Sequence, residues 1–186
     1  EYLNGLRHGK SKEYDNNDNI IFEGIYIYDK RWNGKGSEYD CEGHLIFEGE
    51  FLNSLRWNGT GKEYKDGKLV FEGEYLNGLK NKGKEYDNHG NLIYEGEYLY
   101  GERNGKGKGK EYDGYGNLIY EGDYLNGDRH GNGKVVFDDI LIFEGEYLNG
   151  KRNGKGKEYN DGHLIFEGEY LNGLRHGKSK EYDNND

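Results

Sequence analysis

The sequence predicts an all-β protein, an elongated single-layer antiparallel array in which β-hairpins repeat as a solenoid-like meander. The first reason is a period, because an aromatic-Glu-Gly core recurs in steps of 25, 24, 23, 26, 23 and 23 residues. Such a period is typical of repeat proteins whose units pack only on their neighbours. The second is turn chemistry, since Asn-Gly pairs follow the core in most copies. The third is composition. The chain has 33 Gly and no Pro, and its apolar content of only 32% is too low for a large compact core.

Each repeat is expected to be one hairpin. Residues 164–171 alternate with period two, which puts two rings and a glycine on one face and two glutamates on the other. Asn172 and Gly173 tolerate positive φ and begin a turn. Residues 177–182 then form the return strand, and a second turn like that at 87–90 leads into the next repeat. Successive hairpins pair in sequence order as a meander.

The core of every copy is a glycine between two aromatic rings. The glycine leaves a gap in which a neighbouring ring or backbone can pack closely. The core residues are Phe22, Gly24, Tyr26, Phe47, Gly49, Phe51, Phe71, Gly73, Tyr75, Tyr94, Gly96, Tyr98, Tyr120, Gly122, Tyr124, Phe143, Gly145, Tyr147, Phe166, Gly168 and Tyr170. Gly105 is expected in a turn instead, where alanine should be tolerated far better than valine at Gly96 or Gly122.

We expect residues 1–186 to form one continuous array of about seven repeats, with cores at 22, 47, 71, 94, 120, 143 and 166. A partial repeat at 1–18 is identical to 169–186. With two strands per repeat and about 4.8 Å between strands, seven repeats would span on the order of 70 Å. Length changes are expected at the turns and the start of the return strand, with Trp32 and Trp57 in an enlarged first turn and two extra residues at 106–110. The step from core aromatic to the following basic residue stays at nine.

Residues 143–156 show the fullest form of the repeat: aromatic-Glu-Gly-x-aromatic, then Asn-Gly, a basic residue and Gly-x-Gly. This pattern resembles the MORN repeat family, and the resemblance extends over the whole chain. It implies a tandem β-hairpin fold. It also implies a structural role, because MORN arrays often organise cytoskeletal or membrane-proximal assemblies.

The motifs predict no catalytic, metal or cofactor-binding residues. Residues 5–11 superficially resemble a phosphate loop, but they are one residue short of the Walker spacing and lie in a hairpin. Equivalent histidines such as His8 and His130 should lie about 10 Å or more apart, too far to share a metal. Glutamate pairs such as Glu48 and Glu50 recur in most repeats. We therefore expect ladders with lysines of the return strands instead of an active site.

Two polar segments receive separate interpretations. Asn58 begins an Asn-Gly-Thr sequon and is a candidate glycosylation site in an exposed turn. Residues 15–19 lack the glycine and terminal glutamate of a calcium loop, so a polar turn is expected there.

These features predict a non-catalytic structural or scaffolding protein, not an enzyme, with tyrosine rings on one face and mixed charge on the other as an extended protein-interaction surface. The net charge of −10 argues against nucleic acid as a partner, and no small-molecule substrate or cofactor is expected. The alternative is MORN-type binding of membrane lipid, such as phosphoinositide, or membrane tethering. The excess of 36 acidic over 26 basic residues opposes it, although 106–110 forms a local basic patch. An extracellular fibre and a cytoskeletal scaffold both stay open.

The identity of 1–18 with 169–186 adds a hypothesis of self-association. Other pairs of repeats differ at many positions, whereas Ser11 and Ser179 both stand where other copies have glycine. Strand edges at both ends would be ready to pair head to tail, which gives an open filament. We therefore expect a segment of a fibre, continuous either through a longer polypeptide or by strand pairing between chains. In the covalent case, the residues after 186 should resemble residues 19–24.

Overall fold

The computed structural model describes residues 1–183, without the side chains of 106–108. Every regular element in that range is a β-strand, which confirms the all-β prediction. By its internal contacts the chain divides into two compact units, Glu1–Lys82 and Gly83–Asp186. One continuous array over 1–186 stays a prediction.

Unit 1 is an antiparallel meander in which β3 to β8 pair in sequence order, next to a separate two-stranded pair of β1 with β2. The strands are β1 (Tyr2–Leu3), β2 (Leu6–Arg7), β3 (Gly9–Tyr14), β4 (Ile20–Ile27), β5 (Lys30–Tyr39), β6 (Leu45–Leu52), β7 (Leu55–Lys65) and β8 (Lys68–Leu76). Strand β9 (Leu79–Tyr86) contains the boundary between the units.

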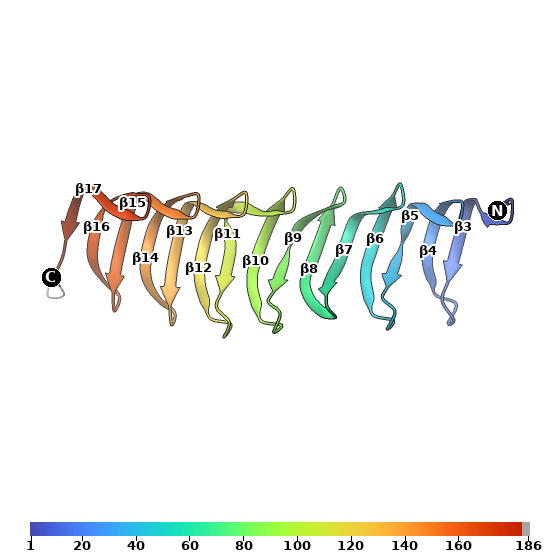
Figure 1. Ribbon diagram of the computed structural model, residues 1–186, viewed down its shortest axis with the longest axis horizontal. Helices are drawn as coiled ribbons and strands as arrows, with labels where there is room; N and C mark the ends of the chain where they lie inside the picture. Colours follow the sequence, from blue (N-terminus) through green and yellow to red (C-terminus); the bar gives the residue numbers. More distant parts are fainter. Residues whose placement is uncertain (184–186) are drawn as a thin grey trace. The chain divides into compact units, whose positions relative to one another are not determined.

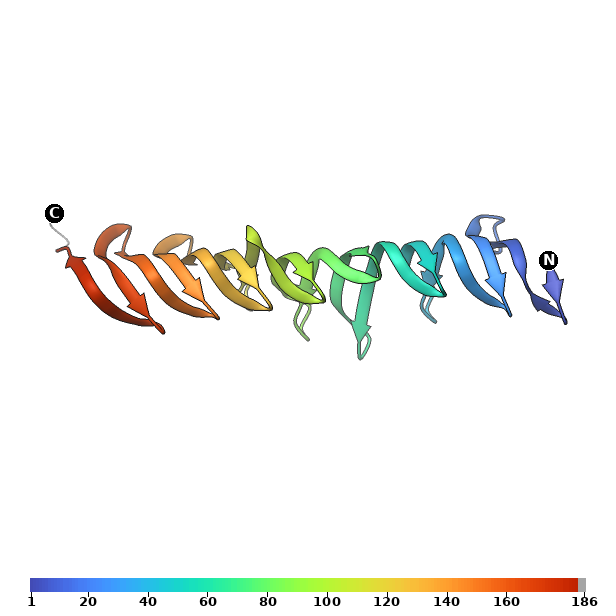
Figure 2. The same cartoon turned by 90° about the horizontal axis from the view of Figure 1, so that it is seen from above.

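Unit 2 continues the same pattern, with β10 to β17 paired antiparallel in sequence order (Figure 1). The strands are β10 (Leu92–Leu99), β11 (Glu102–Tyr112), β12 (Leu118–Leu125), β13 (Asp128–Phe137), β14 (Ile140–Leu148), β15 (Lys151–Asn160), β16 (His163–Leu171) and β17 (Leu174–Glu181). From above, these hairpins follow one another from green to red in the order of the sequence (Figure 2).

The first turn of each hairpin contains two residues with positive φ. Asn172 has φ 53° and Gly173 has φ 90°, values that match the twist of antiparallel strands and that asparagine and glycine adopt most readily. The enlarged first turn expected around Trp32 and Trp57 is wrong. Both tryptophans lie within strands, β5 and β7, after two-residue turns. The extra residues at 106–110 are absorbed as a register shift between β10 and β11, opposite Glu95 and Glu97.

The second turn is organised in four repeats by an aspartate that opens it. In the turn after β9, Asp87 Oδ1 accepts hydrogen bonds from the backbone N–H groups of His89 and Asn91, at 2.8 and 2.9 Å. Gly90 in the same turn has φ 88°. Asp15, Asp40 and Asp113 make the equivalent bonds. The polar run 15–19 is thus a turn of this kind.

The first strand of each hairpin bends toward its aromatic side. Two rings four residues apart on an extended strand would stand about 13 Å apart. The centroids of Phe143 and Tyr147 are instead 5.7 Å apart, edge to face, and all the rings paired in this way lie between 5.2 and 5.9 Å. The glycine between the rings marks the bend, and a register shift follows it between Gly145 and Tyr147. The curvature of these strands is visible in Figure 1.

The hydrophobic core consists of fourteen aromatic side chains, none more than 9% exposed. They are the two rings of each repeat, Phe22, Tyr26, Phe47, Phe51, Phe71, Tyr75, Tyr94, Tyr98, Tyr120, Tyr124, Phe143, Tyr147, Phe166 and Tyr170. Within each unit a second ring also meets the core ring of the preceding repeat, as Tyr170 meets Phe143 at 5.4 Å, and the same contact is made by Phe51, Tyr75, Tyr124 and Tyr147. Contact between neighbouring repeats therefore runs through edge-to-face ring pairs, a favoured aromatic geometry.

Candidate interaction surface

In several repeats the core ring lies on glycines from two paired strands. A Cβ atom added to Gly24 would come within 2.9 Å of Phe22 Cζ and within 2.7 Å of the Cα of Gly34 on the paired strand. A Cβ at Gly34 or Gly36 would meet the same ring at 2.8 Å. The glycines are therefore required by close approach, as the sequence predicted, but they serve both strands of the hairpin.

A basic side chain covers the other side of each core ring. The guanidinium of Arg152 lies 4.0 Å from the ring centroid of Phe143, and Lys80 Nζ lies 4.2 Å from that of Phe71. The equivalent contacts at the other five cores range from 4.0 to 5.1 Å. This cation–π contact explains the constant nine-residue step, because the hairpin turn returns the chain to the ring after that number of residues.

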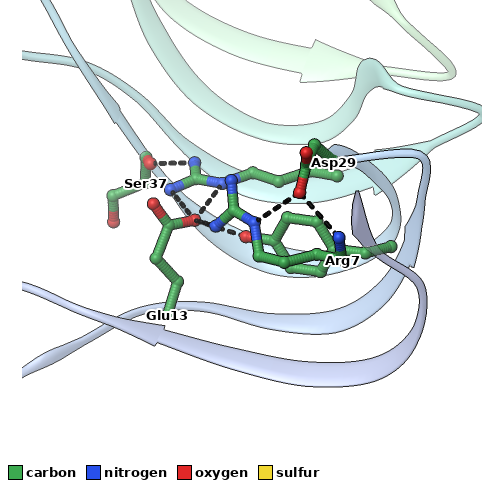
Figure 3. A network of polar contacts seen from close by, with 6 residues as sticks. Arg7, Glu13, Asp29 and Ser37 are labelled. Carbon is green, nitrogen blue, oxygen red and sulfur yellow. Dashed lines mark hydrogen bonds and ion pairs between the residues drawn. The ribbon is translucent and has the colours of Figure 1, made fainter. Parts of the chain in front are cut away.

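A glutamate from the preceding repeat binds both the basic residue and the second ring. Glu13 accepts hydrogen bonds from the Tyr26 hydroxyl and from Arg31 Nε, the latter at 3.1 Å, and Arg31 also donates to the Ser37 carbonyl (Figure 3). Glu111 binds Tyr124 and Arg129 in the same way. The glutamate stands directly opposite the core ring in the ladder, as Glu13 does opposite Phe22. Three strands are thereby tied together at one carboxylate.

These contacts shift the pKa values of the groups involved. Burial alone would raise the pKa of the Glu111 carboxyl, but hydrogen bonds from Arg129 and Tyr124 outweigh it, so the net shift is downward. Burial and the bond to that carboxylate raise the pKa of the Tyr124 hydroxyl well above its usual range. The carboxylate is thus held ionised and the phenol neutral, which suits a structural hydrogen bond.

The glutamate, the basic residue and the hydroxyl of the second ring form a cluster, and two repeats lack one of its members. Phe51 has no hydroxyl to donate, and Glu38 there binds only Arg56, at 2.7 Å. Val135 stands opposite Tyr120 and Phe143, at the ladder position that Glu111 and Glu158 occupy in other repeats. Arg152 turns instead to Glu158 at 3.0 Å, within its own hairpin.

The first turn of each hairpin is bound to the return strand of the repeat before it. The Gly150 N–H donates to the Arg129 carbonyl at 2.9 Å, and the Gly173 N–H to the Arg152 carbonyl at 2.8 Å. Asn33 and Asn58 add side-chain oxygens that accept from the N–H groups of Asn53 and Asn77. These bonds therefore attach each such turn to the preceding hairpin.

The ring face is consequently unavailable to a partner, which corrects the expectation of an exposed face of core tyrosine rings. Glycines, basic groups and carboxylates surround these rings, and all fourteen are at most 9% exposed. Apart from Tyr2 on β1, the better exposed tyrosines of the described strands lie on the return strands, among them Tyr14, Tyr39 and Tyr64 at 52, 49 and 41%. The opposite face is therefore the candidate interaction surface.

In unit 2 the opposite face carries two rows of charged side chains, here called the ladder face. One row alternates strictly, because the register places acidic and basic residues opposite each other on successive strands. It consists of Glu121, Lys134, Glu144, Lys157, Glu167 and Lys180. The second row consists of Asp123, Asn132, Glu146, Lys155, Glu169 and Lys178, all charged except Asn132. The expected ladders of glutamate with lysine are present, with Lys134 Nζ 3.9 Å from a Glu144 oxygen.

A groove of about 1100 Å³ runs between the two rows. Each of the six strands β12 to β17 contributes three consecutive residues to it, and the middle one is glycine in the first five strands and Ser179 in the last. The floor is therefore nearly bare backbone, while the walls are charged. On the wall, Tyr159 donates to Glu144 at 2.8 Å, and burial together with this bond raises the pKa of Tyr159 to about 12.

Unit 1 does not repeat this regular ladder. Lys12 pairs with Glu23 at 3.1 Å, but Glu48 faces Ser37 and Thr60 where unit 2 would have lysines. The register also differs in the two hairpins that carry the tryptophans. There the core glycine pairs with a residue ten positions later, Gly24 with Gly34 and Gly49 with Gly59, whereas Gly145 pairs with Gly156, eleven positions later. The alternating charge pattern is thus a property of unit 2.

A comparison with known families identifies the repeat. The pattern of the MORN repeat matches residues 1–19, 94–108, 120–139, 143–164 and 166–185, which together cover just over half of the chain. The chain belongs to the MORN-repeat family. A comparison with the curated proteins finds no significant match.

The MORN match omits the repeats with cores at 22, 47 and 71, yet the structure shows the cation–π contact at all three and the close approach of glycines to the ring at 22 and 47. The sequence interpretation missed the glutamate of the cluster. The signal was present in the chain, since a glutamate precedes the basic residue by 18 positions in several repeats, as Glu13 precedes Arg31 and Glu111 precedes Arg129.

Two predicted environments in the MORN array are wrong. Asn58 lies within β7, not in an exposed turn. Its Nδ2 donates to Glu50 at 2.9 Å and its Oδ1 accepts from the Asn77 N–H at 2.9 Å, so both ends of the amide are engaged. Gly105 lies in β11 with φ 125°, a conformation that side chains disfavour, so alanine would be strained there.

The remaining candidates show no shared site. His8 and His130 lie at corresponding places in units 1 and 2, and among the described residues no group of three or more His, Cys, Asp or Glu is placed to hold a metal ion. The lysines at 106 and 108 of the predicted basic patch lie outside the described side chains. Within the described chain there is no helix of the length and apolarity needed to cross a membrane.

Proposed function

We propose that this MORN protein is a non-catalytic scaffold and that the ladder face of unit 2 is where it holds an elongated protein partner. The observation that carries the proposal is the groove across β12 to β17, with a glycine floor between two charged rows. The fourteen core rings are buried, whereas the charged rows and the bare backbone between them face outward.

The spacing of the ladder indicates the kind of partner. Neighbouring strands lie about 4.8 Å apart, so charge of one sign recurs about every 10 Å along the row. One turn of an α-helix rises about 5.4 Å, so acidic and basic side chains that alternate every three or four positions recur at nearly the same interval. A helix of this kind can oppose each glutamate with a base and each lysine with an acid, while the glycine floor lets it approach closely.

Such binding should be modest in affinity and sensitive to salt, because the ladder side chains are partly solvated. Lys134 is 61% exposed and Glu144 is 33% exposed. Exposed ion pairs contribute about 0–1 kcal/mol each and are screened by salt. Ion pairs to six strands add up, and only a partner whose charges match the spacing of the ladder can form all of them. This match would make binding selective for such a partner.

The experiment compares two labelled helical peptides of identical composition by fluorescence anisotropy. In one, acidic and basic residues alternate with helical spacing; in the other, all acidic residues precede all basic ones. We expect the alternating peptide to bind about tenfold more tightly, which corresponds to about 1.4 kcal/mol. Equal binding of the two peptides, or no binding by either, would contradict the proposal.

Charge reversal on the protein supplies the matched control. Lys157→Glu breaks the alternation in the middle of the ladder and should weaken binding of the alternating peptide about tenfold. Lys12→Glu reverses a lysine of unit 1 that pairs with Glu23 at 3.1 Å but lies outside the groove, and it should leave binding unchanged. A similar loss in both variants would indicate a general charge effect.

The proposed scaffold also associates end to end, as a segment of a fibre. Support comes from the identity of residues 1–18 with residues 169–186. We expect the particle mass measured by light scattering to rise with protein concentration, with unbranched assemblies in electron micrographs.

Lipid binding at the ladder face would contradict the proposal of a protein partner there. The alternating ladder offers no uninterrupted basic cluster on the described side chains of unit 2, and anionic membranes attract such clusters. We expect no flotation with phosphoinositide vesicles at physiological salt. Flotation abolished by Lys157→Glu would instead assign the ladder face to lipid.

A further inference from the structure

The first strands of unit 1 hold β4 and β5 through a specific set of contacts. Strand β3 pairs with β4 so that Lys12 faces Glu23, with 3.1 Å between their charged groups. Glu13 accepts from Tyr26 and Arg31. Figure 3 shows this network together with Arg7, whose Nε lies 3.2 Å from Asp29.

Every residue that segment 1–18 contributes to these contacts recurs in segment 169–186. Lys12, Glu13 and Arg7 correspond to Lys180, Glu181 and Arg175. Strand β17, which carries the three copies, is exposed at each of its eight residues. It therefore offers Lys180 and Glu181 in the same order, and with the same backbone alternation, as the segment that pairs with β4, whereas its Arg175 is held by Glu158 and Glu181.

The ring contacts favour the second segment as a partner of β4. Inside the units a second ring meets the core ring of the preceding repeat, as Phe51 meets Phe22 at 5.7 Å. At the corresponding place Tyr26 has the guanidinium of Arg7 at 4.5 Å over its ring. The hairpin of β16 and β17 carries a complete core, with Phe166 packed on Tyr170 at 5.6 Å. Placed on β4, it would bring Phe166 to Tyr26 and restore the ring contact found inside the units.

We propose that two copies of this chain join by strand exchange, in which β16 and β17 of one copy take the place of β1 to β3 on β4 of the other. The inference rests on the end-to-end association in the proposed function and specifies its joint. The register follows from the equivalent pairs, so Lys180 faces Glu23 and Ser179 faces Gly24 of the second copy. Such a joint is heterologous and leaves each copy able to join a further one.

Mixed cysteine variants test the register. On a Cys41→Ser background, one preparation carries Lys180→Cys and the other carries Glu23→Cys; they are mixed and treated with a short bifunctional maleimide. We expect a covalent heterodimer on denaturing gels. The matched control replaces Glu23→Cys with Glu144→Cys, whose ladder neighbours Lys134 and Lys157 belong to its own chain, and it should give at least tenfold less product.

Identical substitutions in the two identical segments provide the sharper measurement. Glu13→Ala removes the bonds that hold β3 to Tyr26 and Arg31, so it should release β4 and raise the heterodimer yield at limiting concentration about tenfold. Glu181→Ala removes the same bonds from the incoming strand and should lower the yield by a similar factor. Circular dichroism of each variant verifies that the β-structure is retained.

Opposite effects of these two substitutions support exchange at β4. Equal effects of both, or cross-linking no stronger than with Glu144→Cys, would overturn the proposed joint. Assembly seen by light scattering without cross-linking at 23 and 180 would leave the scaffold function standing and reject this joint. Lys157→Glu should leave the cross-link unchanged, which separates the joint from partner binding on the ladder face.

Discussion

Single glycines determine how closely each aromatic ring approaches the backbone of its hairpin. At Gly122 an added Cβ would lie 2.5 Å from Tyr120 Oη and 2.6 Å from the Asn132 carbonyl oxygen of the facing strand. Neither atom can move without shifting the ring or the ladder. The requirement for glycine is therefore steric and is shared by two strands.

Gly122→Val should destabilise the protein by about 1–3 kcal/mol or more, the usual cost of overpacking a tight site. The measurement is the urea midpoint at constant slope. Gly114→Ala is the control, because Gly114 has no atom within 4 Å of its added Cβ and no positive φ. Gly105 cannot serve as that control, since its φ of 125° strains any side chain. Similar midpoints for the two variants would show that the ring does not rest on Gly122.

Val135 marks a position where the chain lacks an interaction found in other repeats. Val135→Glu places a carboxylate opposite Phe143, with Tyr147 and Arg152 in the positions that Tyr124 and Arg129 occupy around Glu111. We expect a gain of about 0.5–1.5 kcal/mol in the free energy of unfolding, the usual net value of a hydrogen bond. Val135→Gln has similar length without charge and should gain less. A loss of stability with glutamate would mean that its carboxylate is buried without its partners.

Among the elements, the return strand carries the residue that ties neighbouring hairpins together. Glu111 on β11 binds Tyr124 on β12 and Arg129 on β13, and Arg129 lies 4.1 Å from the Tyr120 ring centroid. The pairing of β-strands alone would leave the rings open on one side. The carboxylate and the basic group close that side and fix the bend.

Acid should weaken this connection in a predictable window. The folded-state pKa of Glu111 is lowered, so its contribution is present above the unfolded value of about 4.3 and is lost as pH falls through the folded pKa. Glu111→Gln should lower stability by about 1–2 kcal/mol at pH 7 and much less near pH 3. Urea unfolding at both pH values measures the difference. Glu102→Gln, at an exposed site on the same strand, should have little effect at either pH.

At the scale of the whole molecule, each repeat contacts its sequence neighbours, so stability should scale with the number of repeats. The two units are each built in this way. No long-range closure is needed, because the ring pairs, turns and carboxylate clusters connect adjacent hairpins only. A whole repeat should therefore be removable.

Deletion of residues 143–165 joins Ile142 to Phe166 and preserves the Leu-Ile-aromatic sequence at the junction. We expect the shortened protein to keep its β-type circular dichroism and to unfold with a urea slope reduced roughly in proportion to the residues lost. Deletion of residues 143–154 removes half a repeat and should abolish cooperative unfolding, because the ladder loses its register. Tolerance of both deletions would argue against register as the source of order.

The sequence by itself determined the β-hairpin repeat, the positive-φ turns such as Asn172-Gly173, and the rings and glycines of the core. These follow from local rules, since alternation and turn chemistry act within a few residues. Only the tertiary structure decided that the rings are covered by Arg152 and its equivalents, that Asn58 is engaged, and that Glu13 serves the next two strands. Those contacts depend on the bend at each glycine and on the register shift after it. The same bend removed the ring face from the surface and left the charged ladder face of unit 2 exposed, where we propose that a partner binds.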